Sequence, residues 1–281
     1  MDVTDLSPIA QKAMTGLLDD PIFEMIPLSN ALEQAGFLPA GARISVTASP
    51  NKTLEDSLDL AADLTERGFR VTPHLAARMT VDLAHLERLL GRMSEIGIET
   101  AFVVGGDGEY TGAFYDGLSL LQGMERIGHE LRVGVPAYPE GHPKIPDEAL
   151  ATALADKQAY ASWMTSQMCF DSKALLGWLG RARRSGIDLP LVLGLPGAAD
   201  RARLLKIATR IGVGRSLSFL RKNTGLISAF VRPGGYDPGE LLFGLGDEMA
   251  DDNAAMVGVH IYTFNQCDLT ESWRQGLLAA L

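Results

Sequence analysis

Side chains that could carry out acid–base chemistry are concentrated in one short stretch, residues 133–143 (VGVPAYPEGHP). The stretch begins as an apolar run typical of a strand, and the two prolines in its polar half prevent further strand pairing. Tyr138, Glu140 and His142 therefore follow the end of a strand, where they offer a phenol, a carboxylate and an imidazole. On these residues alone, a surface turn and a functional site are equally good interpretations.

A second carboxylate occurs inside an apolar run near the N-terminus. Glu24 lies in residues 22–27 (IFEMIP), between Phe23 and Met25. An unpaired buried carboxylate is costly and usually acquires a raised pKa, and such a carboxyl group can donate a proton near neutral pH. We predict that Glu24 is a general acid; the alternative is a hydrogen-bonded glutamate of the core.

Polar residues also stand at the ends of other strand-like runs. The carboxyl ends of parallel strands meet at one end of a barrel, so we expect these side chains to share one mouth. An amide such as that of Gln167 offers a donor and an acceptor to the edge of a heterocycle. Simpler interpretations are a core histidine, a tight Gly-Gly-Asp turn and a polar residue within the barrel. The set comprises Thr47, His74, Asp107, Gln167, Tyr262 and Asn265.

Strand-like and helix-like segments alternate along the chain. The apolar patterns predict strands at residues 22–27, 43–49, 70–76, 100–104, 163–170, 189–195 and 258–264, and at the start of 133–143. Helices are predicted at residues 1–20, 53–67, 81–96, 114–127, 147–160, 172–184, 200–211 and 269–281. Less regular segments are expected at residues 216–221 and 236–256.

Eight strands that alternate with helices predict a parallel sheet, and eight such units predict one closed (β/α)8 TIM barrel. We expect a single domain over residues 1–281, with residues 1–20 as an N-terminal helical extension. An open doubly wound sheet is the alternative, although no glycine fingerprint of the Rossmann type follows the first strand.

The composition excludes several classes of protein. The 281 residues are 46% hydrophobic and carry a net charge of −10, which argues against nucleic-acid or membrane partners. Two cysteines do not form a disulfide framework or a zinc site. No signal peptide or membrane-spanning run is visible, so we expect a cytoplasmic protein. No strong metal-ligand, P-loop or nucleophile-elbow motif occurs, and we predict no metal.

A series of residues occurs in a recognisable order between residues 22 and 266. The series is Phe23-Glu24, Pro27, Val46-Thr47, Pro73-His74-Leu75, Gly106-Asp107, Ala137-Tyr138-Pro139-Glu140, His142-Pro143, Lys157, Ser166-Gln167, Phe170-Asp171, Tyr262-Thr263 and Asn265. It resembles the methylenetetrahydrofolate reductase family, whose fold is a (β/α)8 barrel. The Tyr-Pro-Glu-x-His-Pro element is fairly specific, and the other motifs are informative as an ordered set.

The resemblance implies reduction of 5,10-methylenetetrahydrofolate to 5-methyltetrahydrofolate by NADH or NADPH. It implies that Glu24 helps to protonate the bridging nitrogen, which opens the ring to an iminium that accepts hydride. It also implies that Asp107 and Gln167 contact the pterin, and we expect Tyr262 and Asn265 to contact this substrate too. Residues expected on the cofactor side are Thr47, His74, Gly106, Tyr138, Glu140, His142 and Lys157.

Some residues differ from the family's usual pattern. Gly105 and Asp156 stand where the family has cations that bind flavin phosphates, and only Lys157 of that set is retained. Residues 195–200 also lack the expected aromatic. Two missing cations remove charge-assisted contacts to a diphosphate. We therefore predict no FAD site of the usual kind, and a flavin-independent branch in which the nicotinamide transfers hydride directly to the folate.

Other interpretations stay open at this point. Arg221 and Lys222 are predicted to hold an anionic tail of the folate or the cofactor, although plain surface charge explains them equally well. The same site could run the reaction as oxidation of 5-methyltetrahydrofolate in a demethylation pathway. The chain could also be a non-catalytic pterin-binding barrel. The sequence leaves open the choice between NADH and NADPH and between a monomer and a homo-oligomer.

Overall fold

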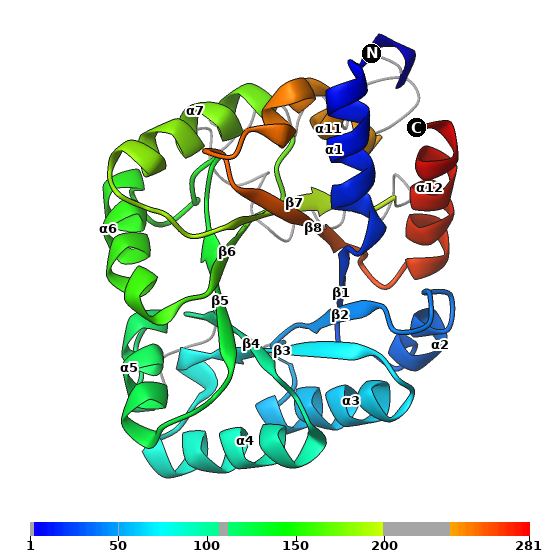
Figure 1. Ribbon diagram of the computed structural model, residues 1–281. Helices are drawn as coiled ribbons and strands as arrows, with labels where there is room; N and C mark the ends of the chain where they lie inside the picture. Colours follow the sequence, from blue (N-terminus) through cyan, green and yellow to red (C-terminus); the bar gives the residue numbers. More distant parts are fainter. Residues whose placement is uncertain (1–2, 50, 107–111, 199–236) are drawn as a thin grey trace.

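Eight parallel strands form a closed barrel in which they follow one another in chain order and β8 pairs with β1 (Figure 1). The computed structural model describes residues 3–49, 51–106, 112–198 and 237–281. The closed barrel confirms the predicted (β/α)8 fold and shows that the open-sheet alternative is wrong. The strands are β1 (Ile22–Met25), β2 (Arg43–Val46), β3 (Arg70–Ala76), β4 (Thr100–Val104), β5 (Arg132–Ala137), β6 (Trp163–Ser166), β7 (Leu191–Pro196) and β8 (Met256–Tyr262).

Helices surround the barrel and cover the outer face of its strands (Figure 1). The α-helices are α1 (Pro8–Asp19), α2 (Ala31–Ala35), α3 (Leu54–Glu66), α4 (Leu83–Ile96), α5 (Gly117–Ile127), α6 (Asp147–Lys157), α7 (Ser172–Arg184), α11 (Gly239–Leu245) and α12 (Cys267–Ala280). Short 3-10 helices are η1 (Val3–Asp5), η2 (Ala77–Met79), η3 (Gln158–Tyr160) and η4 (Gly246–Ala250). The segments predicted at residues 200–211 and 216–221 lie outside the described residues.

Local hydrogen bonds explain where several helices begin and end. The Thr53 hydroxyl accepts a hydrogen bond from Asp56 N, and the Asp56 carboxylate accepts one from Thr53 N, so a capping box starts α3. Asp116 accepts from Ser119 N at 2.8 Å and starts α5 three residues later than predicted. Gly97 ends α4 with a φ of 82°, a left-handed conformation that glycine adopts without strain.

Strands β1 and β6 end earlier than predicted, and a side chain accepts a hydrogen bond from a backbone amide just beyond each end. After β1, Ile26 N donates to Asn265 Oδ1 at 2.8 Å instead of to a neighbouring strand. After β6, Met168 N donates to Gln167 Oε1 at 2.8 Å, whereas Gln167 N and Cys169 N still donate to Ala137 O and Gly194 O of the neighbouring strands. Most other predicted boundaries differ from the observed ones by three residues or fewer, and the short helix α2 was not predicted.

The interior of the barrel is divided into layers, because alternate residues of each strand point inward. Four residues from different strands form an apolar cluster that fills the middle: Ile22, Phe102, Trp163 and Val192. A larger apolar core lies between the strands and the surrounding helices. Glu24 follows Ile22 by two residues and therefore lies on the inner side, one layer closer to the carboxyl ends of the strands.

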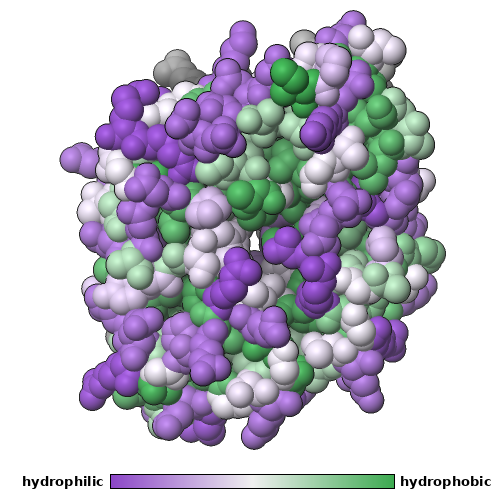
Figure 2. Space-filling model, viewed as in Figure 1, coloured by the Kyte–Doolittle hydropathy of each residue, from purple (hydrophilic) through white to green (hydrophobic). Residues whose placement is uncertain are grey.

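The first and last helices lie side by side and close the outer ring (Figure 1). Arg274 of α12 is buried and donates to Leu18 O of α1 at 2.7 Å, while its guanidinium also pairs with Glu271 at 2.8 Å. The N-terminal extension is thereby packed against the barrel. Seen along the barrel axis, the surface is hollowed near its centre, and both hydrophilic and hydrophobic residues border the hollow (Figure 2). Within the described ranges, no helix has the length and apolar character to cross a membrane.

Candidate functional site

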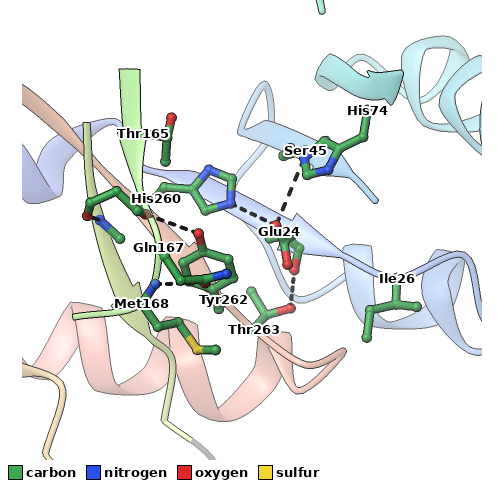
Figure 3. A network of polar contacts seen from close by, with 12 residues as sticks. Glu24, Ile26, Ser45, His74, Thr165, Gln167, Met168, His260, Tyr262 and Thr263 are labelled. Atoms are coloured by element: carbon green, nitrogen blue, oxygen red, sulfur yellow. Dashed lines mark hydrogen bonds and ion pairs between the residues drawn. The ribbon is translucent and has the colours of Figure 1, made fainter. Parts of the chain in front are cut away.

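Glu24 lies between two histidines at the carboxyl end of the barrel (Figure 3). Its Oε2 atom is 3.1 Å from His260 Nε2 and 3.9 Å from His74 Nε2. The Glu24 side chain is 16% exposed, whereas the two histidines are buried. The sequence suggested an unpaired buried carboxylate; the structure instead shows a half-buried carboxylate with an imidazole at hydrogen-bond distance.

Strand register brings these three side chains together. Strand β1 lies between β2 and β8, and Glu24 is level with Ser45 on one side and Tyr262 on the other. His260 precedes Tyr262 by two residues, so both side chains face the barrel interior. His74 reaches the site from β3, and its Nε2 lies 2.7 Å from the Ser45 hydroxyl.

His74 is held in its neutral form by its surroundings. Burial lowers the pKa of His74 to about 4, the nearby Glu24 carboxylate opposes this shift, and His260 adds to it. The imidazole also packs against the ring of Phe102, with ring centroids 4.8 Å apart. At neutral pH, His74 therefore supplies a polar but uncharged wall beside Glu24, and it does not form an ion pair with it.

His260 is a member of the site that sequence reasoning missed. Its ring lies 4.8 Å from that of Tyr262 and 6.5 Å from that of Phe102, and the side chain is 3% exposed. The sequence did contain one signal for this residue, because His260 lies in an apolar strand two residues before the predicted substrate residue Tyr262. Its partner Glu24 is 236 residues away in the chain, so only the closed barrel reveals the pair.

The residues that follow β8 support the backbone beneath Glu24. Thr263 Oγ1 donates to Glu24 O at 2.5 Å. The Asn265 amide accepts from Ile26 N and donates to Ile26 O and to Asn30 Oδ1. Since Asn265 is 1% exposed, this network gives it a structural role between β1 and β8, and its predicted contact with substrate stays a prediction.

Tyr262 and Gln167 approach the mouth from β8 and from the loop after β6 (Figure 3). The Tyr262 hydroxyl donates to Ser166 O at 3.1 Å, and burial together with the Glu24 carboxylate raises the pKa of Tyr262 well above its usual value. Gln167 is exposed, and its backbone N–H donates to Ala137 O at 2.8 Å. The structure therefore brings Glu24, His74 and Tyr262 together, with Gln167 at the rim.

The polar stretch after β5, which contains Glu140, is hydrogen-bonded to the loop after β6. Glu140 Oε1 accepts hydrogen bonds from Phe170 N at 2.7 Å and Asp171 N at 2.9 Å. Burial raises the pKa of Glu140, and these two backbone donors partly offset the shift. Tyr138 and His142 pack edge to face with ring centroids 5.3 Å apart. The stretch thus positions the loop after β6, and its predicted cofactor contacts stay predictions.

Three other predicted cofactor residues lie around the same end of the barrel or beside it. Thr47 is half-buried and its backbone N–H donates to Met25 O at 2.9 Å, which extends the β1–β2 pairing toward the mouth. Gly106 has a φ of 88°, and an added Cβ would come within 3.3 Å of the Ala76 Cβ. Lys157 lies at the end of α6. Asp107 lies outside the described residues.

The surroundings of Lys157 are a poor fit to a flavin diphosphate. Lys157 lines a cleft of about 540 Å³ together with three carboxylates, Asp116, Glu148 and Asp156. Burial lowers the pKa of Lys157, and Asp116 opposes the shift. At Gly105 an added Cβ would meet no atom of the described residues within 4 Å. One cation among three anions repels a diphosphate rather than binding it.

The architecture and the site together define a (β/α)8 barrel with an acid–imidazole pair at the carboxyl ends of its strands, where barrel enzymes carry their active sites. The chain belongs to the methylenetetrahydrofolate reductase family: the family's sequence model matches residues 28–213. Glu24 and His260 lie on either side of this matched range.

Known proteins that are similar to this chain include one from yeast and one from a bacterium. Methylenetetrahydrofolate reductase 2 of Saccharomyces cerevisiae is 29% identical over 87 residues, a stretch that covers 30% of this chain and 14% of the yeast protein. A protein from Clostridium thermocellum that binds two copies of 5-methyl-5,6,7,8-tetrahydrofolic acid superposes with a TM-score of 0.65. That superposition covers 98% of this chain and 100% of the other at 12% identity, so it shows a shared fold.

The lowered pKa of His74 predicts a loss of stability in acid. The unfolded chain binds a proton at this residue near pH 6.5, whereas the folded protein does so only near pH 4. The contribution of neutral His74 to the free energy of unfolding is therefore fully present above pH 6.5. It is lost as the pH drops, by up to about 3 kcal/mol near pH 4. Urea unfolding of His74→Gln should lack this component, because glutamine keeps a polar partner for Ser45 but does not titrate.

The comparison is made between pH 7 and pH 4.5 for the wild type and the variant. Titration of the other acidic groups is common to both proteins and cancels in the difference. Parallel stability curves for the two proteins would show that His74 is not held neutral.

Proposed function

We propose that this protein reduces 5,10-methylenetetrahydrofolate to 5-methyltetrahydrofolate with NADH or NADPH, and that Glu24 is the general acid. The observation that carries the proposal is the 3.1 Å pair of Glu24 and His260 at the mouth of a barrel of this family. The folate bound by the Clostridium thermocellum protein supports a folate as the substrate class.

The reaction needs one proton and one hydride. Transfer of a proton from the Glu24 carboxyl group to the bridging nitrogen breaks its bond to the methylene carbon and leaves an iminium at the other nitrogen. The nicotinamide supplies a hydride, which adds to this carbon and gives the methyl group and oxidised nicotinamide. The electron pair of the broken bond stays on the bridging nitrogen, so charge and atoms balance.

The neighbours of Glu24 suit this role. His260 holds Oε2 at hydrogen-bond distance, while Oε1 makes no hydrogen bond within the described residues and is available to the substrate. His74 is neutral, so it does not fix Glu24 as the anion of an ion pair. The contact with His260 orients the Glu24 carboxyl group, and this carboxyl group delivers the proton to the folate.

Recognition of the pterin falls to groups at the rim. Gln167 is exposed beside the mouth, and its amide N–H groups can donate to the heterocycle edge. Tyr262 supplies a half-buried aromatic ring next to Glu24 and His260. Asp107, which lies outside the described residues, is assigned to the pterin on the family resemblance alone.

We further propose that hydride passes directly from the nicotinamide to the folate. The family's phosphate-binding cations are replaced here by Gly105 and Asp156, and the cleft at Lys157 carries three carboxylates. A flavin bound through its diphosphate would lose its charge-assisted hydrogen bonds. The barrel mouth then has to accommodate both substrates at once.

A cofactor-resolved assay tests this arrangement. The purified protein is expected to show no flavin absorbance in stoichiometric amount, and to oxidise NADH or NADPH in the presence of methylenetetrahydrofolate without added FAD. Added FAD should leave the rate unchanged. A yellow protein with one flavin per chain, or turnover that depends strictly on FAD, would overturn direct transfer but not the assignment of Glu24.

Substitution of the proposed acid tests the chemistry separately. Glu24→Gln keeps the size of the side chain but removes the proton donor, so turnover should fall by about a hundredfold or more. Binding of 5-methyltetrahydrofolate, measured by calorimetry, should change little because the amide preserves the shape of the mouth.

Glu87→Gln is the matched control, since Glu87 is exposed on α4, and it should retain full activity. If the activity of Glu24→Gln stays within a fewfold of that of the wild type, Glu24 is not the general acid. A wild-type protein that binds folate but turns over with neither nucleotide would identify a non-catalytic pterin-binding barrel.

A further inference from the structure

A second cavity lies at the opposite end of the barrel, where the strands begin. It has a volume of about 760 Å³, within the range of small-molecule sites. Arginines at the first positions of β2, β3 and β5 line it, with Trp163 at the first position of β6. The three arginines are Arg43, Arg70 and Arg132.

Among the described residues, the cations that line this cavity outnumber the carboxylates. Asp20 and Glu99 are the carboxylates that line it. Asp20 pairs with Arg70 at 2.5 Å, whereas Glu99 is exposed. The guanidinium groups of Arg43 and Arg132 make no hydrogen bond or ion pair within the described ranges. Each guanidinium has five N–H donors, so the donors of both arginines are available to a ligand. The site is positively charged although the net charge of the chain is −10.

Arg43 is the most confined of the three cations. It is half-buried at the start of β2, directly level with Ile22 of β1 and Arg70 of β3. Burial lowers the pKa of Arg43, the cations Arg70 and Arg132 add to the effect, and Asp20 opposes it. A partly buried cation with like charges beside it is costly unless an anion accompanies it.

Trp163 forms a rigid wall of the same cavity. Its indole N–H donates to Thr165 Oγ1 at 3.2 Å, and the Arg132 guanidinium lies over its ring at 6.0 Å. Gly134 faces the ring so closely that an added Cβ would lie 2.3 Å from it. The ring is therefore fixed in place, and its fluorescence should report on changes in the cavity.

We propose that this cavity binds a small polyanion that carries at least two carboxylate or phosphate groups. Guanidinium groups bind both kinds of oxyanion through paired N–H donors, and Arg43 and Arg132 supply two such forks beside one aromatic wall. The apolar layer of Ile22, Phe102 and Val192 separates this cavity from the mouth that contains Glu24. The site is thus distinct from the folate site and does not depend on the proposed reaction.

Binding of two probes tests the site in the intact protein. Inorganic pyrophosphate represents phosphates and citrate represents carboxylates, each titrated by calorimetry and by tryptophan fluorescence at low ionic strength. We expect at least one probe to bind at one per chain and to change the emission of Trp163. Arg43→Gln should weaken that binding by about tenfold or more, and Arg132→Gln should act in the same direction. The probe that binds more tightly identifies the oxyanion class.

Arg126→Gln is the charge-matched control, because Arg126 is exposed at the end of α5. The affinity of this variant for the probe should stay within twofold of that of the wild type. Thermal unfolding establishes that each variant is folded, and Arg132→Gln replaces Arg43→Gln if the latter is not. Trp163→Phe should remove the fluorescence change while calorimetric binding persists. Absence of binding by both probes, or equal weakening in Arg126→Gln, would overturn the proposal.

Discussion

The contact between Glu24 and His260 is the constraint on which the rest of the site depends. A carboxylate inside a barrel requires a polar partner, because an unpaired buried charge is costly. His260 supplies that partner at 3.1 Å from the neighbouring strand β8, and Thr263 and Asn265 fix the backbone around it. Closure of the barrel is therefore a condition for the chemistry, since β1 and β8 meet only when the sheet is closed.

The inward-facing residues at the two ends of the barrel differ in chemical type. At the carboxyl ends, Glu24, His74 and His260 form a compact polar group with one neutral imidazole. In the middle, Phe102 and its apolar neighbours separate the two ends. At the amino ends, arginines occupy the first positions of three strands. This arrangement puts an apolar layer between the arginines and the acid.

Much of the fold, but less of the site, could be predicted from the sequence. The strands β3 and β4 were predicted at their observed bounds, because their apolar patterns and flanking glycines are local signals. Glu24 stood out because a carboxylate in an apolar strand is unusual. His260 did not, because a histidine in such a strand resembles a core residue until its partner is known. The contacts of Glu140 with the loop after β6 span 30 residues, and no local pattern reveals them.

The coupling between Glu24 and His260 in catalysis is the central claim, and a double-mutant cycle measures it directly. His260→Phe keeps an aromatic ring beside Phe102 and Tyr262 but removes the nitrogen that contacts Glu24. In the wild-type background this change should lower kcat by about tenfold or more. In the Glu24→Gln background it should have little further effect, because the unit is already broken. Equal losses in both backgrounds would show that the two residues act independently and would contradict the account.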